Sequence, residues 1–125
     1  MRPGVDRRAL GSKAEDVAAR FLTAQGLALL ERNFRRRLGE LDLVARCGDV
    51  LVIAEVRTRS SNAYGGAAAS VDGLKRRRIV RAAQQLLQKR KDLAELRVRF
   101  DVLVVHDPTA AAPRVEWIKH AFEAT

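Results

Sequence analysis

The sequence predicts an α/β fold in which a mixed sheet of four to five strands is flanked by helices, in the order α-β-β-β-α-β-β. Two segments carry apolar residues at helical spacing, and short runs rich in Val, Leu and Ile have the length of strands. The chain has 125 residues, of which 47% are hydrophobic. That length supports one domain around a single core rather than two domains.

The first helix sets the expected domain boundary. Residues 1–11 are basic and contain an early proline and glycine, so we expect a basic N-terminal arm there and a single domain over residues 12–125. Ser12 opens the helix with the capping-box pattern Ser-x-x-Glu, in which the Glu15 side chain returns to the backbone N–H of Ser12. Gly26 is placed to end the helix.

The other element boundaries follow from apolar runs and turn residues. Runs without strict alternation are typical of strands that are covered on both faces. The expected strands are 27–34, 39–46, 50–58 and 97–105, with 114–119 as an edge strand, and a second helix covers roughly 70–90. Asp101, inside the fourth of these strands, is expected to be held by a structural pairing.

Acidic residues inside the predicted hairpin point most directly to function. A two-residue Gly-Asp turn suits type II′ geometry and sets a register in which Asp42 faces Glu55 and Glu40 faces Arg57. Because strand side chains alternate, all four are expected on one face. A carboxylate in an apolar sheet is unfavourable unless a cation or hydrogen bonds compensate it. The hairpin therefore predicts a positive charge between its strands.

A hard divalent cation fits that requirement. Mg²⁺ and Mn²⁺ take oxygen ligands, whereas Zn²⁺ and copper favour the imidazole and thiolate groups that are missing beside Asp42 and Glu55. Arg57 is placed to hold a phosphate oxygen. A structural ion pair or a solvated sheet face is the plainer alternative. For Glu15 too, two interpretations stay open: the capping box, or an outer ligand of a metal or a water.

Net charge indicates the class of partner. Lys and Arg number 24 against 15 Asp and Glu, which gives a formal charge of +9. Such an excess is typical of nucleic-acid-binding proteins. The sequence contains no run of about 18 apolar residues, so it does not predict a membrane-spanning helix. No apolar segment follows the basic N-terminus as it would in a signal peptide. We therefore expect a cytoplasmic protein without a membrane partner, and its single cysteine, Cys47, fits a reducing compartment.

Basic clusters supply the candidate phosphate contacts. One cluster precedes the acidic strand, another opens the second helix, and the loop after the third strand directly follows the proposed site. Charge runs on helices are commonly no more than solvated faces. Aromatic residues are scarce, which favours duplex or branched DNA held by its backbone over a single-strand stacking surface. The candidate nucleic-acid-binding residues are Arg35, Arg36, Arg37, Arg59, Tyr64, Lys75, Arg76, Arg77 and Arg78.

Over almost its whole length the chain resembles the small bacterial YraN-type proteins, which are grouped with endonuclease-like and Holliday-junction-resolvase-like folds. The hairpin is the most specific part of the match. The residues that carry it are Gly11 with Glu15, Arg32-Asn33, Gly39-Glu40-Leu41-Asp42-Leu43-Val44, Glu55-Val56-Arg57-Thr58-Arg59, Tyr64-Gly65, Lys75, Arg99-Phe100-Asp101-Val102 and Ala121-Phe122.

The resemblance implies a restriction-endonuclease-like core, whose motif is an Asp followed by Glu-x-Lys on the next strand, with an acidic residue from the first helix. Here these are Asp42, Glu55, the position of Arg57, and Glu15. It implies catalysis by these four residues with Mg²⁺ or Mn²⁺. One or two divalent ions would be held by Asp42, Glu55 and the Val56 carbonyl, and Glu15 and Glu40 would adjust the outer shell. A homodimer is likewise implied by resemblance alone.

One departure from the family pattern affects the expected chemistry. Arg57 stands where the family has Lys, and a planar guanidinium cannot reproduce the geometry of a compact ammonium. Two function classes therefore remain open: a metal-dependent endonuclease acting on structured or duplex DNA, and a non-catalytic nucleic-acid-binding protein that keeps the fold. Charge alone also allows an acidic protein or an RNA assembly as partner. Without metal, the carboxylate cluster is expected to raise at least one apparent pKa.

Overall fold

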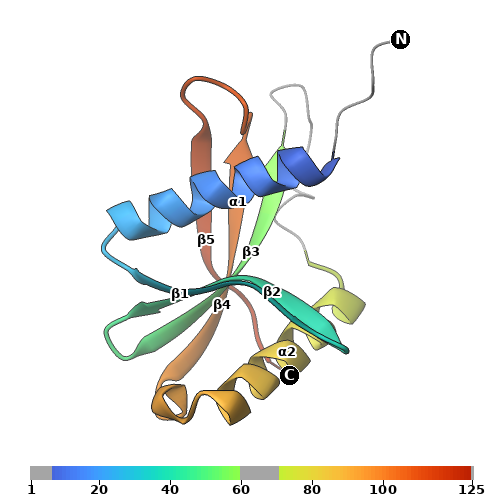
Figure 1. The fold of residues 1–125 in the computed structure, drawn as a ribbon, viewed down its shortest axis with the longest axis vertical. Coiled ribbons are helices and arrows are strands. Elements are labelled where there is room, and N and C mark those ends of the chain that lie inside the picture. Colours follow the sequence, from blue (N-terminus) through green and yellow to red (C-terminus); the bar gives the residue numbers. More distant parts are fainter. Residues whose placement is uncertain (1–6, 60–70, 125) are drawn as a thin grey trace.

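The apolar runs assemble into one mixed five-stranded sheet with a helix on each face (Figure 1). The computed structural model describes residues 7–59 and 71–124. Its elements are α1 (Arg7–Ala24), β1 (Ala28–Arg36), β2 (Gly39–Cys47), β3 (Val50–Arg59), α2 (Gly73–Lys89), the short 3-10 helix η2 (Lys91–Leu93), β4 (Arg97–His106) and β5 (Arg114–Phe122). The predicted element order is confirmed.

The strand order β1-β2-β3-β4-β5 follows the sequence. All neighbours are antiparallel except β3 and β4, which run parallel and are joined through α2. A parallel pair needs a long crossover connection, and the helix provides it. This five-stranded mixed sheet with two flanking helices is consistent with the restriction-endonuclease-like core that the resemblance implies.

Each helix covers its own apolar cluster. The α1-side cluster contains Val17 and Leu22 of the helix against Leu43, Val52 and other residues of the sheet. The α2-side cluster is larger and contains the buried residues of α2 together with side chains from all five strands. Both faces of the central strands are therefore covered, as their continuous apolar runs predict.

The start of α1 differs from the prediction. The helix begins at Arg7 rather than at Ser12, so Ser12 and Glu15 lie inside it. An N–H in the interior of a helix bonds to the carbonyl four residues earlier and is not available to a capping side chain. The capping-box interpretation is therefore wrong. Of the proposed basic arm, residues 7–11 are helical, and residues 1–6 lie outside the described part of the chain.

The turn and register of the β2–β3 hairpin are confirmed. Gly48 has a φ of 60°, as the first central residue of a type II′ turn requires. The paired positions run from Cys47 with Val50 to Leu43 with Ala54, in the predicted register. The ladder ends there, so Asp42 and Glu55 lie just beyond its last pair, and the expected pairing of Glu40 with Arg57 does not form.

A bend in the β1–β2 ribbon explains why the ladder stops. Leu43 belongs to the α1-side cluster and Leu41 to the α2-side cluster, although in a regular strand residues two apart share a face. The bend coincides with Asn33 in β1, which has a φ of 52°, a conformation that Asn tolerates. Beyond the bend the ribbon turns toward α2 (Figure 1), and a Cβ on Gly39 would lie 2.2 Å from the Arg78 carbonyl oxygen.

Candidate functional site

The bend places the Asp42 carboxylate against the part of β3 that continues beyond its ladder with β2. Its Oδ2 accepts a hydrogen bond of 2.9 Å from the backbone N–H of Val56. The neighbouring Glu55 side chain is only 6% exposed, and the two carboxyl groups are close enough to share a hydrogen bond. Two acidic side chains from adjacent strands therefore meet in a largely water-excluded place, as the hairpin register predicts.

The electrostatics of this pair are strongly perturbed. Burial, followed by the hydrogen bond and the negative charge of Glu55, raises the pKa of Asp42 to about 8. The Val56 N–H and the charge of Lys75 act in the opposite direction but do not offset these causes. The expected rise of an apparent pKa is confirmed, although desolvation rather than repulsion between carboxylates is its largest cause.

Lys75 contributes a positive charge to the pair. Its Nζ lies 3.3 Å from Oε2 of Glu55, and its side chain is about one-third exposed. The sequence places Lys75 among the candidate phosphate contacts, because it stands in a basic run, and among the residues that carry the family resemblance, but not beside the acidic pair. No signal near the hairpin identifies it as the partner of Glu55, since only the packing of α2 on the sheet brings them together.

Glu15 approaches the site from α1. Its pKa is raised by burial and by the charges of Asp42 and Glu40, while a hydrogen bond from Asn33 and the guanidinium of Arg32 lower it. Its carboxylate therefore lies on the Asp42 side of the helix, where the resemblance implies an acidic residue. Its role as a metal or water ligand stays a prediction.

Glu40 and Arg57 lie apart from each other. Glu40 forms an exposed ion pair with Arg35, its partner across β1 and β2, at 3.1 Å. Arg57 lies two residues beyond Glu55, and in the described part of the chain its buried Nε has no hydrogen-bond partner. Within residues 10–59 and 71–124, no three Asp, Glu, His or Cys side chains form a group that could hold a metal ion by themselves. Any ion at this site would need water or substrate oxygens to complete its shell.

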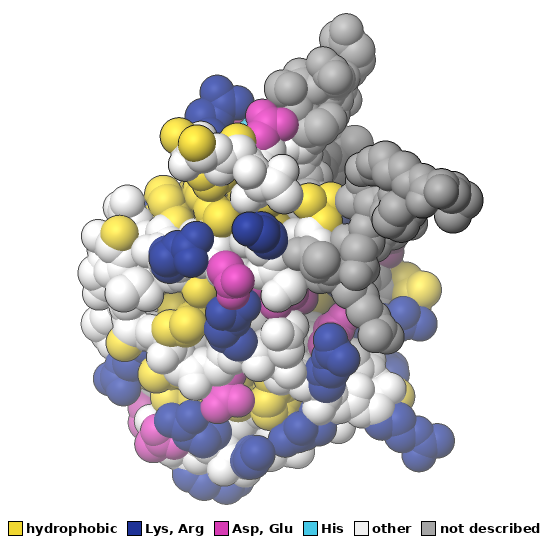
Figure 2. All heavy atoms as spheres, turned by 45° about the horizontal axis from the view of Figure 1, so that its top comes forward, with side chains coloured by type: hydrophobic (Ala, Val, Ile, Leu, Met, Phe, Trp, Pro, Cys, Tyr) yellow, Lys and Arg dark blue, Asp and Glu magenta, His cyan; other side chains and the backbone are white. Residues whose placement is uncertain are grey.

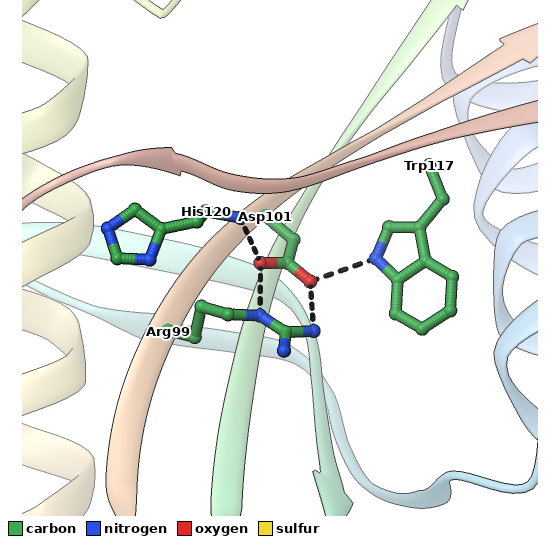
Figure 3. Close-up of polar contacts among 4 residues, drawn as sticks. All are labelled: Arg99, Asp101, Trp117 and His120. Atoms are coloured by element: carbon green, nitrogen blue, oxygen red, sulfur yellow. Dashed lines mark hydrogen bonds and ion pairs between the residues drawn. The ribbon is translucent and has the colours of Figure 1, made fainter.

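A second buried carboxylate, Asp101 of β4, serves structure. Arg99 donates two hydrogen bonds to it, at 2.9 and 2.8 Å, and Trp117 Nε1 and the His120 N–H donate one each, at 2.8 and 2.9 Å (Figure 3). The expected structural pairing of Asp101 is confirmed. Trp117 also packs edge-to-face against Phe21 of α1.

A hollow with a volume of about 650 Å³ lies between the tip of the β1–β2 ribbon and the start of α2. Lys75 also lines it, so the hollow adjoins the carboxylate pair. On the face shown in Figure 2, basic side chains are spread over the surface with acidic ones between them. The lining residues are Arg35, Arg36, Arg37, Leu38, Gly39, Glu40, Leu74, Lys75, Arg77, Arg78 and Arg81.

The hollow gathers most, but not all, of the candidate nucleic-acid-binding residues. Arg76 points elsewhere: its Nε donates to the Val71 carbonyl at 2.6 Å and its guanidinium lies over the Phe122 ring. Arg59 lies at the end of β3, beside a different hollow. Tyr64 lies outside the described residues. Arg81, which continues the basic run at the start of α2 and is part of that candidate phosphate-binding run, also lines the hollow, because helical geometry places it on the same face as Arg77 and Arg78.

Comparison with known proteins identifies the family. The model of the uncharacterised protein family UPF0102 matches residues 14–105. The chain belongs to the UPF0102 family. It is 49% identical over 121 residues to a UPF0102 protein of Methylococcus capsulatus, covering 97% of this chain and 96% of that protein. It is 51% identical over 114 residues to one of Frankia casuarinae, covering 91% and 96%.

The family match includes the acidic hairpin and the whole of α2, and so both parts of the candidate site. A UPF0102 protein of Herminiimonas arsenicoxydans is 45% identical over 123 residues, or 98% of this chain and 94% of that protein. None of the helices in the described ranges has the length and apolar character needed to cross a bilayer. The YraN-type resemblance is thus confirmed as membership of UPF0102.

Proposed function

We propose that this UPF0102 protein is a metal-dependent endonuclease that hydrolyses phosphodiester bonds in duplex or structured DNA. The observation that carries the proposal is the meeting of the half-buried Asp42 with the buried Glu55, a pair that the protein itself compensates only in part. Strongly perturbed carboxylates in such a position are typical of catalytic sites. The arginine-lined hollow beside the pair supplies the positive charge that a DNA backbone requires.

The residues present fit a hard divalent cation, with Mg²⁺ or Mn²⁺ as the cofactor. Asp42 and Glu55 offer carboxylate oxygens and Val56 a backbone carbonyl, which is the donor chemistry that these ions prefer. Glu15 and Glu40 would act through water in the outer shell. When bound, such an ion lowers the pKa of a coordinated water and neutralises charge on the phosphate.

The chain's own groups account for binding and orientation. Arg35, Arg37, Arg77 and Arg78 hold backbone phosphates in the hollow, where guanidinium groups can contact phosphate oxygens through paired hydrogen bonds. The Val56 N–H fixes the orientation of the Asp42 carboxylate. Such contacts position a duplex without reading its sequence, so the proposed specificity is for DNA shape.

A non-catalytic nucleic-acid-binding protein is the second candidate. Arg57 favours it, because a guanidinium replaces the ammonium of the family pattern and its Nε is buried without a hydrogen-bond partner in the described part of the chain. In this alternative the hollow binds DNA, and the acidic pair is a remnant of the fold. We further propose that the protein acts in the cytoplasm and as a homodimer, a state that light scattering would test.

The test is a cleavage assay on linear, flap and four-way DNA with Mg²⁺ or Mn²⁺. We expect cleavage by the native chain, loss of at least about 100-fold in rate in Asp42→Asn, and DNA affinity within about 3-fold of the native value. Asp49→Asn, which changes an exposed acid at the hairpin turn, is the matched control. Salt-dependent DNA binding without cleavage in either metal would favour the binding protein and overturn the enzyme.

A further inference from the structure

We propose that Lys75, from the first turn of α2, supplies the ammonium that contacts the scissile phosphate, in place of the lysine that Arg57 has displaced. The inference rests on the proposed nuclease function. It assigns a catalytic residue that lies outside the hairpin motif, on the helix that follows β3 in the sequence.

The position of Lys75 joins the two parts of the site. Its Nζ contacts Glu55 at 3.3 Å, and the same side chain lines the arginine hollow. Since about one-third of the side chain is exposed, the ammonium keeps donors free for a ligand entering from the hollow. A phosphate held by the arginines next to the carboxylate pair would therefore meet this ammonium.

The first turn of α2 is held firmly enough to position that side chain. Asp72 caps the helix, and its Oδ1 accepts the Lys75 N–H at 2.9 Å. Arg76 anchors the same turn through the Val71 carbonyl and the Phe122 ring. The Lys75 backbone is thus fixed on both sides, and only its flexible side chain needs to adjust to a substrate.

Arg57 is a poorer candidate for the same task. In the described part of the chain its buried Nε makes no hydrogen bond, so one donor of the planar guanidinium has no partner. A guanidinium binds best through paired donors in a fixed plane, whereas an ammonium is a compact point charge with three donors. In this chain the ammonium beside the acidic pair therefore comes from α2 and not from β3.

The proposed reaction needs no proton from Lys75. Water attacks phosphorus, the bond from phosphorus to the leaving oxygen breaks, and that oxygen is protonated by solvent, while the attacking water gives its proton to solvent. Lys75 stays protonated throughout and donates hydrogen bonds to a non-bridging phosphate oxygen, where negative charge develops. Its loss should lower the rate much more than the affinity.

The experiment removes the ammonium and then restores it chemically. Cys47→Ser removes the exposed native thiol, and Lys75→Cys is then made in that background. Single-turnover cleavage is expected to fall by at least about 100-fold, with DNA affinity within about 3-fold. Treatment with 2-bromoethylamine converts the introduced thiol to an ammonium-bearing side chain of nearly the original length, and is expected to recover at least one-tenth of the rate.

Two further variants serve as controls. Lys75→Arg keeps the charge without the compact ammonium and is expected to recover less activity than the aminoethylated protein. Lys89→Cys in the same background removes one lysine from the last turn of the same helix and is expected to leave cleavage unchanged. A drop in DNA affinity in Lys75→Cys that accounts for the whole rate loss would overturn the assignment and return Lys75 to phosphate binding alone.

A readout without catalysis separates this inference from the nuclease proposal. Removing a positive charge 3.3 Å from Glu55 is expected to tighten Mn²⁺ binding several-fold in calorimetry, and aminoethylation to reverse the gain. Unchanged Mn²⁺ affinity, or native-like cleavage by Lys75→Cys, overturns the role of Lys75 while the nuclease proposal stands. A native chain that cleaves none of the substrates overturns both.

Discussion

Two carboxylates on neighbouring parts of the sheet, the buried Asp101 and the half-buried Asp42, have opposite surroundings. Asp101 is fully buried and accepts four hydrogen bonds, two of them from the Arg99 guanidinium. Asp42 accepts a backbone hydrogen bond from Val56, and the carboxyl group that it meets is that of another acid, Glu55. Asp101 therefore stabilises the fold, whereas the ionised form of Asp42 is unfavourable in its surroundings.

The surroundings differ because the groups that contact the two carboxylates come from different parts of the sheet. Asp101 is compensated within β4 and by β5, where a register shift with His120 at a φ of 54° turns a backbone N–H toward the carboxylate. Asp42 lies where the β1–β2 ribbon bends and its ladder with β3 ends, and in the described part of the chain it accepts from the Val56 backbone but from no arginine or tryptophan side chain like those that bind Asp101. The proposed metal site therefore uses a carboxylate that the chain itself satisfies less fully than Asp101.

The largest expected effect is on stability at the satisfied site. Asp101→Ala would leave the Trp117 and His120 N–H groups and the Arg99 charge without their partner, and we expect the free energy of unfolding to fall by about 3–5 kcal/mol. Urea denaturation followed by Trp117 fluorescence would measure it. Asp49→Ala, at an exposed turn, is the control. A loss below about 1 kcal/mol would show that the hydrogen bonds of Asp101 do not stabilise the fold as described.

The docking of the ribbon on α2 gives the next effect. Gly39→Ala places a Cβ against the Arg78 carbonyl, and we expect a loss of about 2–3 kcal/mol in unfolding free energy. In Gly11→Ala the new Cβ meets nothing within 4 Å, and a helical Ala is expected to be neutral or stabilising. If both variants have equal thermal midpoints, the ribbon is not held against α2 as described.

Asp42→Asn should act in the opposite direction to Asp101→Ala. Replacing an acid that is buried beside Glu55 with a neutral isostere removes desolvation and repulsion, so we expect about 2 kcal/mol of added stability at pH 8 in the absence of metal. Thermal denaturation in chelator would report a higher midpoint. A destabilised variant would show that the Asp42 carboxylate is compensated as well as Asp101.

The pH dependence follows from the same carboxyl group. Its pKa is about 8 in the folded chain and near 3.8 when unfolded, so the folded state binds more protons between these values. This contribution to stability is present below about pH 4 and is lost as pH rises to about 8, at no more than about 1.4 kcal/mol per pH unit. Denaturation at about pH 5.5, 7 and 8.5 should show a fall that is reduced in Asp42→Asn. An unchanged slope would contradict the assignment.

The smallest effect concerns the surface pair of Arg35 and Glu40. A double-mutant cycle with Ala at both positions is expected to give a coupling below about 1 kcal/mol, because both side chains are exposed. Urea denaturation of the four proteins measures it. A coupling as large as the effect of Asp101→Ala would mean that charges at the ribbon tip, not only buried ones, organise the site.

Local patterns were sufficient for most of the fold. The Gly-Asp turn determined the hairpin register, and continuous apolar runs identified the covered strands. They failed at the start of α1, because a Ser-x-x-Glu pattern inside a helix resembles one at its end. They also failed beyond Leu43, since the bend at Asn33 depends on packing against α2 and not on strand alternation.

The candidate site was predictable only within the hairpin. The meeting of Asp42 and Glu55 follows from register, but the contact of Glu55 with Lys75 joins distant segments and needed the three-dimensional fold. Helical geometry places Arg76 about 200° around the helix from Arg78, since successive residues point about 100° apart, so its position away from the hollow was within reach of sequence reasoning.

A crystal of the native chain, soaked in Mn²⁺ and measured for anomalous scattering, would show whether the acidic hairpin holds a metal ion. We expect a peak in contact with carboxylate oxygens of both Asp42 and Glu55, and no peak at Asp101, whose oxygens are already occupied by hydrogen bonds. No peak between Asp42 and Glu55 at saturating Mn²⁺ would contradict the claim that this pair is a metal site.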